Sequence, residues 1–124
     1  MGARPARLKK RAEFLAAAAA RRRISTPSLV LQVRQRPEAG DDGPRLGLTV
    51  TKKVGNAVER NRVRRRLRAA AEATLGDHGC PGHDYVLIGR RGTLRRPFAA
   101  IVADLKLAMS RLGAFRREAC EPIG

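Results

Sequence analysis

The most constraining feature of the sequence is a basic block at residues 51–70, TKKVGNAVERNRVRRRLRAA. Eight of the seventeen residues at 52–68 are basic, and Glu59 is the only acid among them. In an isolated helix, like charges four residues apart cost roughly 0.2–0.5 kcal/mol per pair. A bound polyanion removes this repulsion and releases its own counterions. The block therefore predicts a helix that normally lies against nucleic acid.

The composition of the whole chain agrees with this prediction. The chain has 124 residues, a formal net charge of +16 and a sequence pI near 11.7. This length favours one domain over residues 1–124, with an ordered core at about 7–112. A hydrophobic content of 43% is too high for a disordered basic tail. The charge predicts a polyanionic partner, but does not distinguish RNA, DNA and anionic lipid.

The sequence predicts no membrane partner and a cytoplasmic location. The longest aliphatic stretch, LAAAAA at residues 15–20, is far shorter than the roughly 20 residues that span a bilayer. It also lacks the pattern of a signal peptide. Cys80 and Cys120 are the only cysteines, which favours reduced thiols in the cytoplasm. A disulfide between them remains an alternative.

Hydrophobic periodicity predicts six elements along the chain. In order, they are a helix at 7–22, strands at 28–33 and 46–50, a helix from 56 to about 75, a strand at 85–88 and a helix at 97–112. Asn56 is a plausible N-cap and Gly76 a plausible end of the basic helix. This order predicts an α+β domain in which a strand–helix–strand unit places the basic helix on one face of a small sheet.

The two later helices each have a clear apolar stripe, so their buried sides can be predicted. In the basic helix, Arg62 and Arg65 project from the side roughly opposite its stripe. One side of that helix can therefore pack while the other binds. The stripe of the basic helix is Val63, Leu67, Ala70, Ala71 and Thr74, and that of the last helix is Phe98, Ile101, Val102, Leu105, Met109 and Leu112.

The first helix carries an aromatic residue in an unusual place. Its apolar stripe is predicted at Leu8, Ala12, Leu15 and Ala19. At about 100° per residue, Phe14 lies roughly 120° from that stripe, beside Lys10 and Arg11. Phe14 either packs on a second element or provides a stacking platform for a base, flanked by phosphate-binding cations. Because its azimuth departs from the stripe, we expect Phe14 on a cleft surface and not in the main core.

The block KKVGNAVERNRVRRRLR at residues 52–68 resembles the protein subunit of bacterial ribonuclease P. RLKKRAEF near the start and DYVLIGRRG after the basic helix support the resemblance, which covers about residues 7–112 in the same order. The resemblance implies a four-stranded sheet, three helices and an uncommon left-handed β-α-β crossover. It also implies an RNA-binding subunit that, with a catalytic RNA, promotes removal of the 5′ leader from precursor tRNA.

The resemblance further assigns roles to particular residues. Family members often carry aromatic residues where this chain has Ala18 and Gln32, so base stacking on the leader should be weaker here. The residues implied to contact the catalytic RNA are Lys53, Asn56, Arg60, Asn61, Arg62, Arg64, Arg65 and Arg68. Those implied to line the leader cleft are Phe14, Val30 and Gln32, with Lys10 beside Phe14.

No constellation in the sequence predicts a catalytic centre in this chain. His78, Cys80 and His83 give three potential metal ligands in a Gly/Pro-rich loop, whereas a structural zinc site needs four, so we expect no metal there. The expected reaction is phosphodiester hydrolysis with magnesium ions held mainly by the RNA partner and the substrate. We also expect no catalytic carboxylate among the isolated acids of the loop and the tail, which are Asp41, Asp42, Glu118 and Glu121.

Two other functions compete with a subunit of an RNA-based endoribonuclease. A ribosomal or general RNA-binding protein would use the basic helix only as a phosphate anchor. A free-standing nuclease is disfavoured by the missing catalytic constellation. Cleavage of precursor tRNA, assayed with and without a cognate catalytic RNA, distinguishes the three.

Overall fold

Strand β5 (His83–Gly89) lies at the centre of a mixed sheet that the computed structural model describes over residues 5–37 and 43–116. The strand order is β1-β4-β5-β3-β2. Strand β3 pairs antiparallel with β5 and with β2, whereas β4 pairs parallel with β5 and with β1. The other strands are β1 (Ala6–Arg7), β2 (Arg23–Ser25), β3 (Leu29–Gln35) and β4 (Arg45–Thr49).

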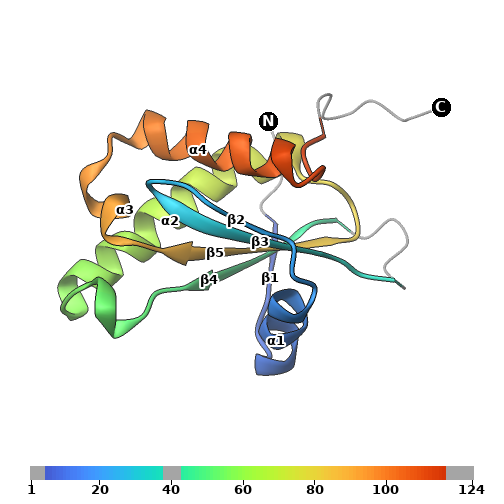
Figure 1. Cartoon of the computed structure of the whole chain (residues 1–124), viewed down its shortest axis with the longest axis horizontal. Coiled ribbons are helices and arrows are strands. Elements are labelled where there is room, and N and C mark those ends of the chain that lie inside the picture. Colours follow the sequence, from blue (N-terminus) through green and yellow to red (C-terminus); the bar gives the residue numbers. More distant parts are fainter. Residues whose placement is uncertain (1–4, 38–42, 117–124) are drawn as a thin grey trace.

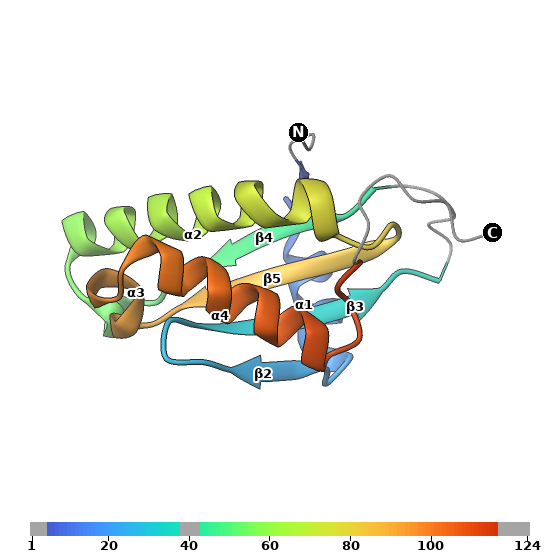
Figure 2. The same ribbon diagram turned by 90° about the horizontal axis from the view of Figure 1, so that it is seen from above.

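Helices cover both faces of this sheet (Figure 1). Two long helices, α2 and α4, lie side by side on one face, whereas α1 lies on the other (Figures 1 and 2). The helical elements are α1 (Arg11–Ala19), the 3-10 turn η1 (Lys52–Val54), α2 (Ala57–His78), α3 (Arg91–Arg95) and α4 (Phe98–Arg111).

The main core lies between the sheet and the pair α2 and α4. The predicted stripe of α2 is confirmed in full, since all five of its residues are buried. From α4, Ile101, Leu105 and Met109 are buried, whereas Phe98 at the start of the predicted stripe is exposed. The inward strand residues include Leu29, Leu31, Val33, Tyr85 and Leu87.

Helix α2 connects two adjacent parallel strands, β4 and β5. With the strands pointing upward and α2 in front of the sheet, β5 lies to the left of β4, so the crossover is left-handed (Figure 2). Nearly all such connections in proteins are right-handed. The hand therefore agrees with the α+β fold that the resemblance implies.

The element count differs slightly from the expectation of four strands and three helices. Within the described residues the sheet has five strands, because the two-residue β1 adds an edge beside β4. A fourth helix, α3, forms in the GRRGTLRR segment. Helix α2 continues two residues past Gly76 and ends at His78. Its N-cap is confirmed: Asn56 Oδ1 accepts from Glu59 N at 2.8 Å, and the Glu59 carboxylate accepts from Asn56 N at 2.9 Å.

The prediction for the first helix is wrong in both length and buried face. The helix covers only Arg11–Ala19, and Leu8 precedes it. Leu15 is 56% exposed and Ala12 and Ala19 are also exposed, whereas Ala17 is the buried residue. In a helix so rich in alanine, the pattern of apolar residues is nearly uniform, and the position of the one large ring decides which face packs.

Some sequence features lie outside the described residues: Asp41, Asp42, Glu118, Cys120 and Glu121. The disulfide alternative for Cys80 therefore stays open. Within residues 5–37 and 43–116, no helix is long and apolar enough to cross a membrane.

Candidate nucleic-acid interface

The outward side of α2 forms the first basic surface. Arg62 and Arg65 are exposed, whereas Val63 and Leu67 on the opposite side of the helix are completely buried. The helix therefore separates packing from charge, as its sequence pattern predicts. Of the other predicted RNA contacts on α2, Asn61 is exposed and Arg60, Arg64 and Arg68 are half-buried.

Two of the predicted RNA-binding residues also have structural roles at the start of α2. Asn56 uses its side-chain oxygen to cap the helix. Asn61 accepts a hydrogen bond from Arg64 Nη1 at 3.0 Å, which fixes the direction of that guanidinium. Lys53 is exposed on η1, just before the cap. The predicted residues thus lie together along one end and one side of α2.

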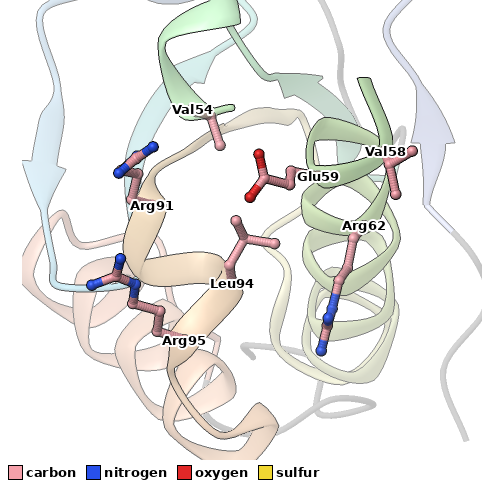
Figure 3. A pocket seen from close by; sticks show the side chains of 7 residues that line it. All are labelled: Val54, Val58, Glu59, Arg62, Arg91, Leu94 and Arg95. Carbon is pink, nitrogen blue, oxygen red and sulfur yellow. The ribbon is translucent and has the colours of Figure 1, made fainter. Parts of the chain in front are cut away.

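Helix α3 extends this basic surface with residues that the sequence analysis did not select. Arg91 and Arg95 lie across a pocket of about 280 Å³ from Arg62. Figure 3 shows Glu59 pointing toward the space between the two helices, with Arg91 and Arg95 on the far side of that space and Arg62 pointing away from Glu59. The two basic pairs in GRRGTLRR are a sequence sign of a phosphate-binding surface. Their position next to α2, however, depends on the tertiary fold. The pocket is lined by Val54, Val58, Glu59, Arg62, Arg91, Leu94 and Arg95.

One arginine of the basic block serves the fold. The Arg66 side chain donates from Nε to the carbonyl of Thr93 at 2.8 Å and from Nη2 to the carbonyl of Arg96. These carbonyls belong to the last turn of α3 and its C-cap. Arg66 therefore holds α3 against α2 and, with it, positions Arg91 and Arg95.

The second candidate surface lies on the opposite face, at the edge of α1. Phe14 is half-buried and packs with the small cluster of Leu8, Ala17 and Val86, apart from the main core. Its ring lies directly over Gly47, where an added Cβ would come within 2.7 Å of Phe14 Cε1. Only glycine leaves room for the ring there. Phe14 also lines an open groove of about 400 Å³, together with Lys9, Arg11, Leu48 and Thr49.

The other predicted leader residues lie near this surface to different degrees. Lys10 is exposed at the N-cap of α1, next to the groove. Val30 and Gln32 lie on the same face of the sheet as α1, because their cross-strand neighbours in β5 are Ile88 and Val86. They are only 7% and 8% exposed. Lys10 and Phe14 are therefore accessible to a ligand, whereas Val30 and Gln32 are nearly closed off.

A buried ion cluster fixes α1 to the sheet. The Asp84 side chain is fully buried and accepts from Arg45 Nε at 2.8 Å, Arg45 Nη2 at 2.9 Å and Arg36 Nη1 at 2.5 Å. Arg34 Nη1 lies 3.7 Å from Asp84 Oδ2. Burial alone would raise the pKa of Asp84, but the hydrogen bonds from Arg45 and Arg36 outweigh it and hold the pKa below its ordinary value.

Arg45 carries this cluster across to α1. Its Nη1 donates to Glu13 Oε2 at 2.8 Å. The other Glu13 oxygen accepts from the backbone N–H groups of Lys9 and Lys10, both at 3.0 Å. The backbone bonds from Lys10 and Lys9 are the main reason that the pKa of Glu13 is lowered, and Arg45 adds to the effect. Glu13 thus caps α1 and ties it to strand β4.

His78 and the Cys80 backbone make other contacts near the C-terminal end of α2. His78 stacks on Phe115 with ring centroids 4.4 Å apart, and its Nδ1 lies 2.8 Å from the Arg116 carbonyl. The Cys80 backbone N–H donates to the Tyr85 hydroxyl, and burial raises the pKa of Tyr85. In the part of the chain that the structure describes, no three His, Cys, Asp or Glu side chains converge as metal ligands.

Comparison with known proteins decides the family. A family model described as Ribonuclease P matches residues 3–113. The ribonuclease P protein component of Paramagnetospirillum magneticum is 49% identical over 121 residues, which cover 94% of this chain and 90% of that protein. The chain belongs to the ribonuclease P protein family. The corresponding component of Gluconacetobacter diazotrophicus is 51% identical over 113 residues, covering 91% of this chain and 96% of that protein.

Solved ribonuclease P proteins share the fold. The protein from Thermotoga maritima matches with a TM-score of 0.70 and 27% identity, covering 85% of this chain and 96% of that one. A Staphylococcus aureus ribonuclease P protein mutant with defective mRNA degradation activity matches with a TM-score of 0.74 and 26% identity, covering 88% and 89%. The resemblance found in the sequence is confirmed, and the chain is a component of a ribonuclease that processes tRNA.

Proposed function

We propose that this ribonuclease P protein binds the catalytic RNA through the outward side of α2 and the 5′ leader of precursor tRNA through the groove beside Phe14. Lys10 and Phe14 would contact the leader, while Val30 and Gln32 would support this surface from the sheet. The residues proposed for the catalytic RNA are Lys53, Asn56, Arg60, Asn61, Arg62, Arg64, Arg65 and Arg68.

The observation that carries the proposal is the separation of charge and packing on α2. Arg62 and Arg65 are exposed although the helix buries Val63 and Leu67 completely. Guanidinium groups recognise phosphate oxygens, often through two parallel hydrogen bonds. The groove on the other face offers one aromatic ring with Lys9 and Arg11 beside it, which suits a single strand with exposed bases.

We place the catalytic centre in the RNA. Asp84 has a fully buried side chain and pairs with three arginines. It therefore has no free access to a phosphodiester. Magnesium ions bound by the RNA and substrate would activate water and stabilise the leaving oxygen. The protein's part is to neutralise phosphates and hold the leader, which should lower the magnesium concentration that cleavage needs.

The test is charge-neutral replacement of Arg62 and Arg65 by glutamine. Assembly with the catalytic RNA should weaken, and the log–log salt slope should fall by about 0.7–0.9 for each lost phosphate contact. The unfolding free energy of the free protein should change little, because both side chains are exposed. Replacement of Lys106 and Arg111 on α4 by glutamine removes the same charge elsewhere and serves as the control.

An equal loss in the control would mean that net charge, rather than α2, determines assembly. Unfolding of the Arg62/Arg65 variant would make these residues structural. A cleavage assay tests the location of the catalytic centre: RNA-free protein should leave precursor tRNA intact, and efficient cleavage by it would contradict the proposal.

A further inference from the structure

The pocket between the first turn of α2 and α3 has a polarity that phosphate binding alone does not explain. Its inner wall is apolar: Val54 is buried and Leu94 packs against the main core. Val58 lies at its edge and is 75% exposed. A phosphate gains no binding free energy from aliphatic walls, whereas the apolar face of a base is stabilised by contact with them. The pocket therefore offers contact area suited to a flat, partly apolar group.

The only acid that lines the pocket, Glu59, also favours a base over a phosphate. Glu59 lies among the lining residues, and its carboxylate accepts one hydrogen bond, from Asn56 N. A carboxylate has about four acceptor positions, so it retains capacity for a ligand's N–H groups. It also repels a phosphate from the inner part of the pocket. Arg91 and Arg95 line the opposite side of the pocket, and the guanidinium of Arg62 points away from Glu59 (Figure 3), so all three can pair with phosphates at the rim.

We propose that this pocket receives one unstacked nucleotide of the catalytic RNA. Its base lies against Val54, Val58 and Leu94, and an N–H edge of the base donates to Glu59. The flanking phosphates pair with the arginines of the rim. This assignment deepens the function proposed above and rests on it, since it names what the α2–α3 end of the basic surface binds.

Size and shape restrict the occupant to a single nucleotide. Pockets for drug-sized ligands occupy roughly 300–1,000 Å³, and this one measures about 280 Å³. Bases of an A-form duplex are stacked and paired, so only a nucleotide in a loop, bulge or end can enter. Guanine fits the acid best, because its Watson–Crick edge carries two neighbouring N–H donor groups.

Arg66 fixes the shape of the pocket in the free protein. It holds the C-terminal end of α3 through the carbonyls of Thr93 and Arg96, and so keeps Leu94 and Arg95 opposite α2. The pocket is thus formed before the RNA binds, which reduces the ordering cost of binding.

The first test is Val58→Ser, assayed by titrating the full-length protein into labelled catalytic RNA at several salt concentrations. Affinity should fall about fivefold, because aliphatic contact with the base is lost. The salt slope should stay the same, because no phosphate contact is removed. Leu107→Ser, at an exposed leucine on α4, is the matched control and should leave affinity unchanged.

The second test is Glu59→Gln, which keeps an oxygen for the Asn56 cap but removes the charge. If a base edge donates to Glu59, affinity should fall by roughly fivefold, because a charge-assisted bond is lost. Tighter or unchanged binding would overturn the assignment, since a phosphate in the pocket would gain from the removal of negative charge.

Failure of this inference can be distinguished from failure of the proposed function. If Val58→Ser binds like wild type while the Arg62/Arg65 variant loses salt slope, α2 binds the RNA but the pocket stays empty. If Val58→Ser weakens only the binding of leader-bearing precursor tRNA to the assembled enzyme, the occupant belongs to the substrate and the assignment to the catalytic RNA is overturned. If the Arg62/Arg65 variant keeps full affinity and slope, the proposed function itself fails.

Discussion

The two faces of the sheet are stabilised by different interactions. On one face, α2 and α4 bury a continuous apolar core that includes Leu67 and Leu105. On the other, α1 packs through a small cluster around Ala17 and Val86, and the Asp84 cluster ties it down. Apolar packing leaves the charges of α2 free for a ligand. The α1 face instead uses several of its charges to maintain its own structure.

The difference shows that the net charge of +16 is not a measure of RNA-binding capacity. Arg36 and Arg45 pair with a buried acid, and Arg66 donates to backbone carbonyls. Arg90 likewise donates to the Thr26 carbonyl at 3.0 Å. The arginines available to RNA are those, such as Arg62 and Arg65, whose side chains are exposed.

The largest expected effect comes from Asp84→Asn, which breaks the cluster on the α1 face. The change leaves the partly exposed guanidinium groups of Arg36 and Arg45 facing an uncharged amide. Removing one partner of a fully buried pair costs about 3–5 kcal/mol, so we expect a loss of about 2–3 kcal/mol here, because water still reaches these arginines. The free energy of unfolding in denaturant measures it. Asp104→Asn is the control, because Asp104 is partly exposed and pairs with the half-exposed Arg96. A loss no larger than that of the control would mean that Asp84 contributes little and that apolar contacts hold both faces.

Acid should act on the α1 face through the same carboxyl group. The folded pKa of Asp84 is lowered, so its contribution is fully present above its unfolded pKa of about 4. It is lost as the pH falls through the folded pKa. Stability of the wild type should therefore decline below about pH 4 more steeply than that of Asp84→Asn. Parallel pH profiles of unfolding free energy for the two proteins would contradict this explanation.

Replacing Arg65 and Arg66 one at a time should distinguish an arginine of α2 that binds RNA from one that stabilises the fold. Arg66→Gln removes bonds to the carbonyls of Thr93 and Arg96 and should cost about 1–3 kcal/mol of stability. Arg65→Gln removes an exposed charge and should change stability by less than about 0.5 kcal/mol, while lowering the salt slope of RNA binding. Thermal unfolding and salt titration together decide the matter. Equal stability losses would mean that Arg65 is also part of the fold.

The sequence predicted the α2 face well because one strong period determines it. Val63, Leu67 and Thr74 recur at helical spacing, and the Asn56 cap precedes a Glu59 that completes the capping box. Local pattern and tertiary packing agree there, so the buried stripe, the exposed arginines and the N-terminus all followed from the spacing.

The α1 face could not be predicted in the same way, because its contacts join distant segments. The position of Phe14 depends on Gly47 in β4, and a lone glycine in a strand does not say which ring fills its place. Asp84 meets Arg36 and Arg45 from two other segments. The two-residue β1 is too short to show an alternating pattern. The role of Arg66 likewise depends on carbonyls of α3, some thirty residues along the chain.

The smallest expected effect concerns Phe14 and tests whether the α1 face binds RNA at all. Phe14→Ala should cost less stability than a core Phe→Ala, which typically costs about 3–5 kcal/mol, because the ring is half-buried and outside the main core. Binding of leader-bearing precursor to the assembled enzyme should weaken by about 1 kcal/mol, the low end of the value for one stacked base. The low end is expected because Ala18 and Gln32 provide no second ring.

The decisive measurement compares precursor tRNA with mature tRNA, which has no leader, on the same assembled enzyme. Mature tRNA should bind almost as before, because it makes no contact with the groove beside Phe14. Leu15→Ala is the matched control: Leu15 is the next residue of α1, is 56% exposed and does not pack on the sheet. Equal losses on both substrates would mean that Phe14 acts through the fold. The α1 face would then be purely structural, and the leader would have to bind elsewhere.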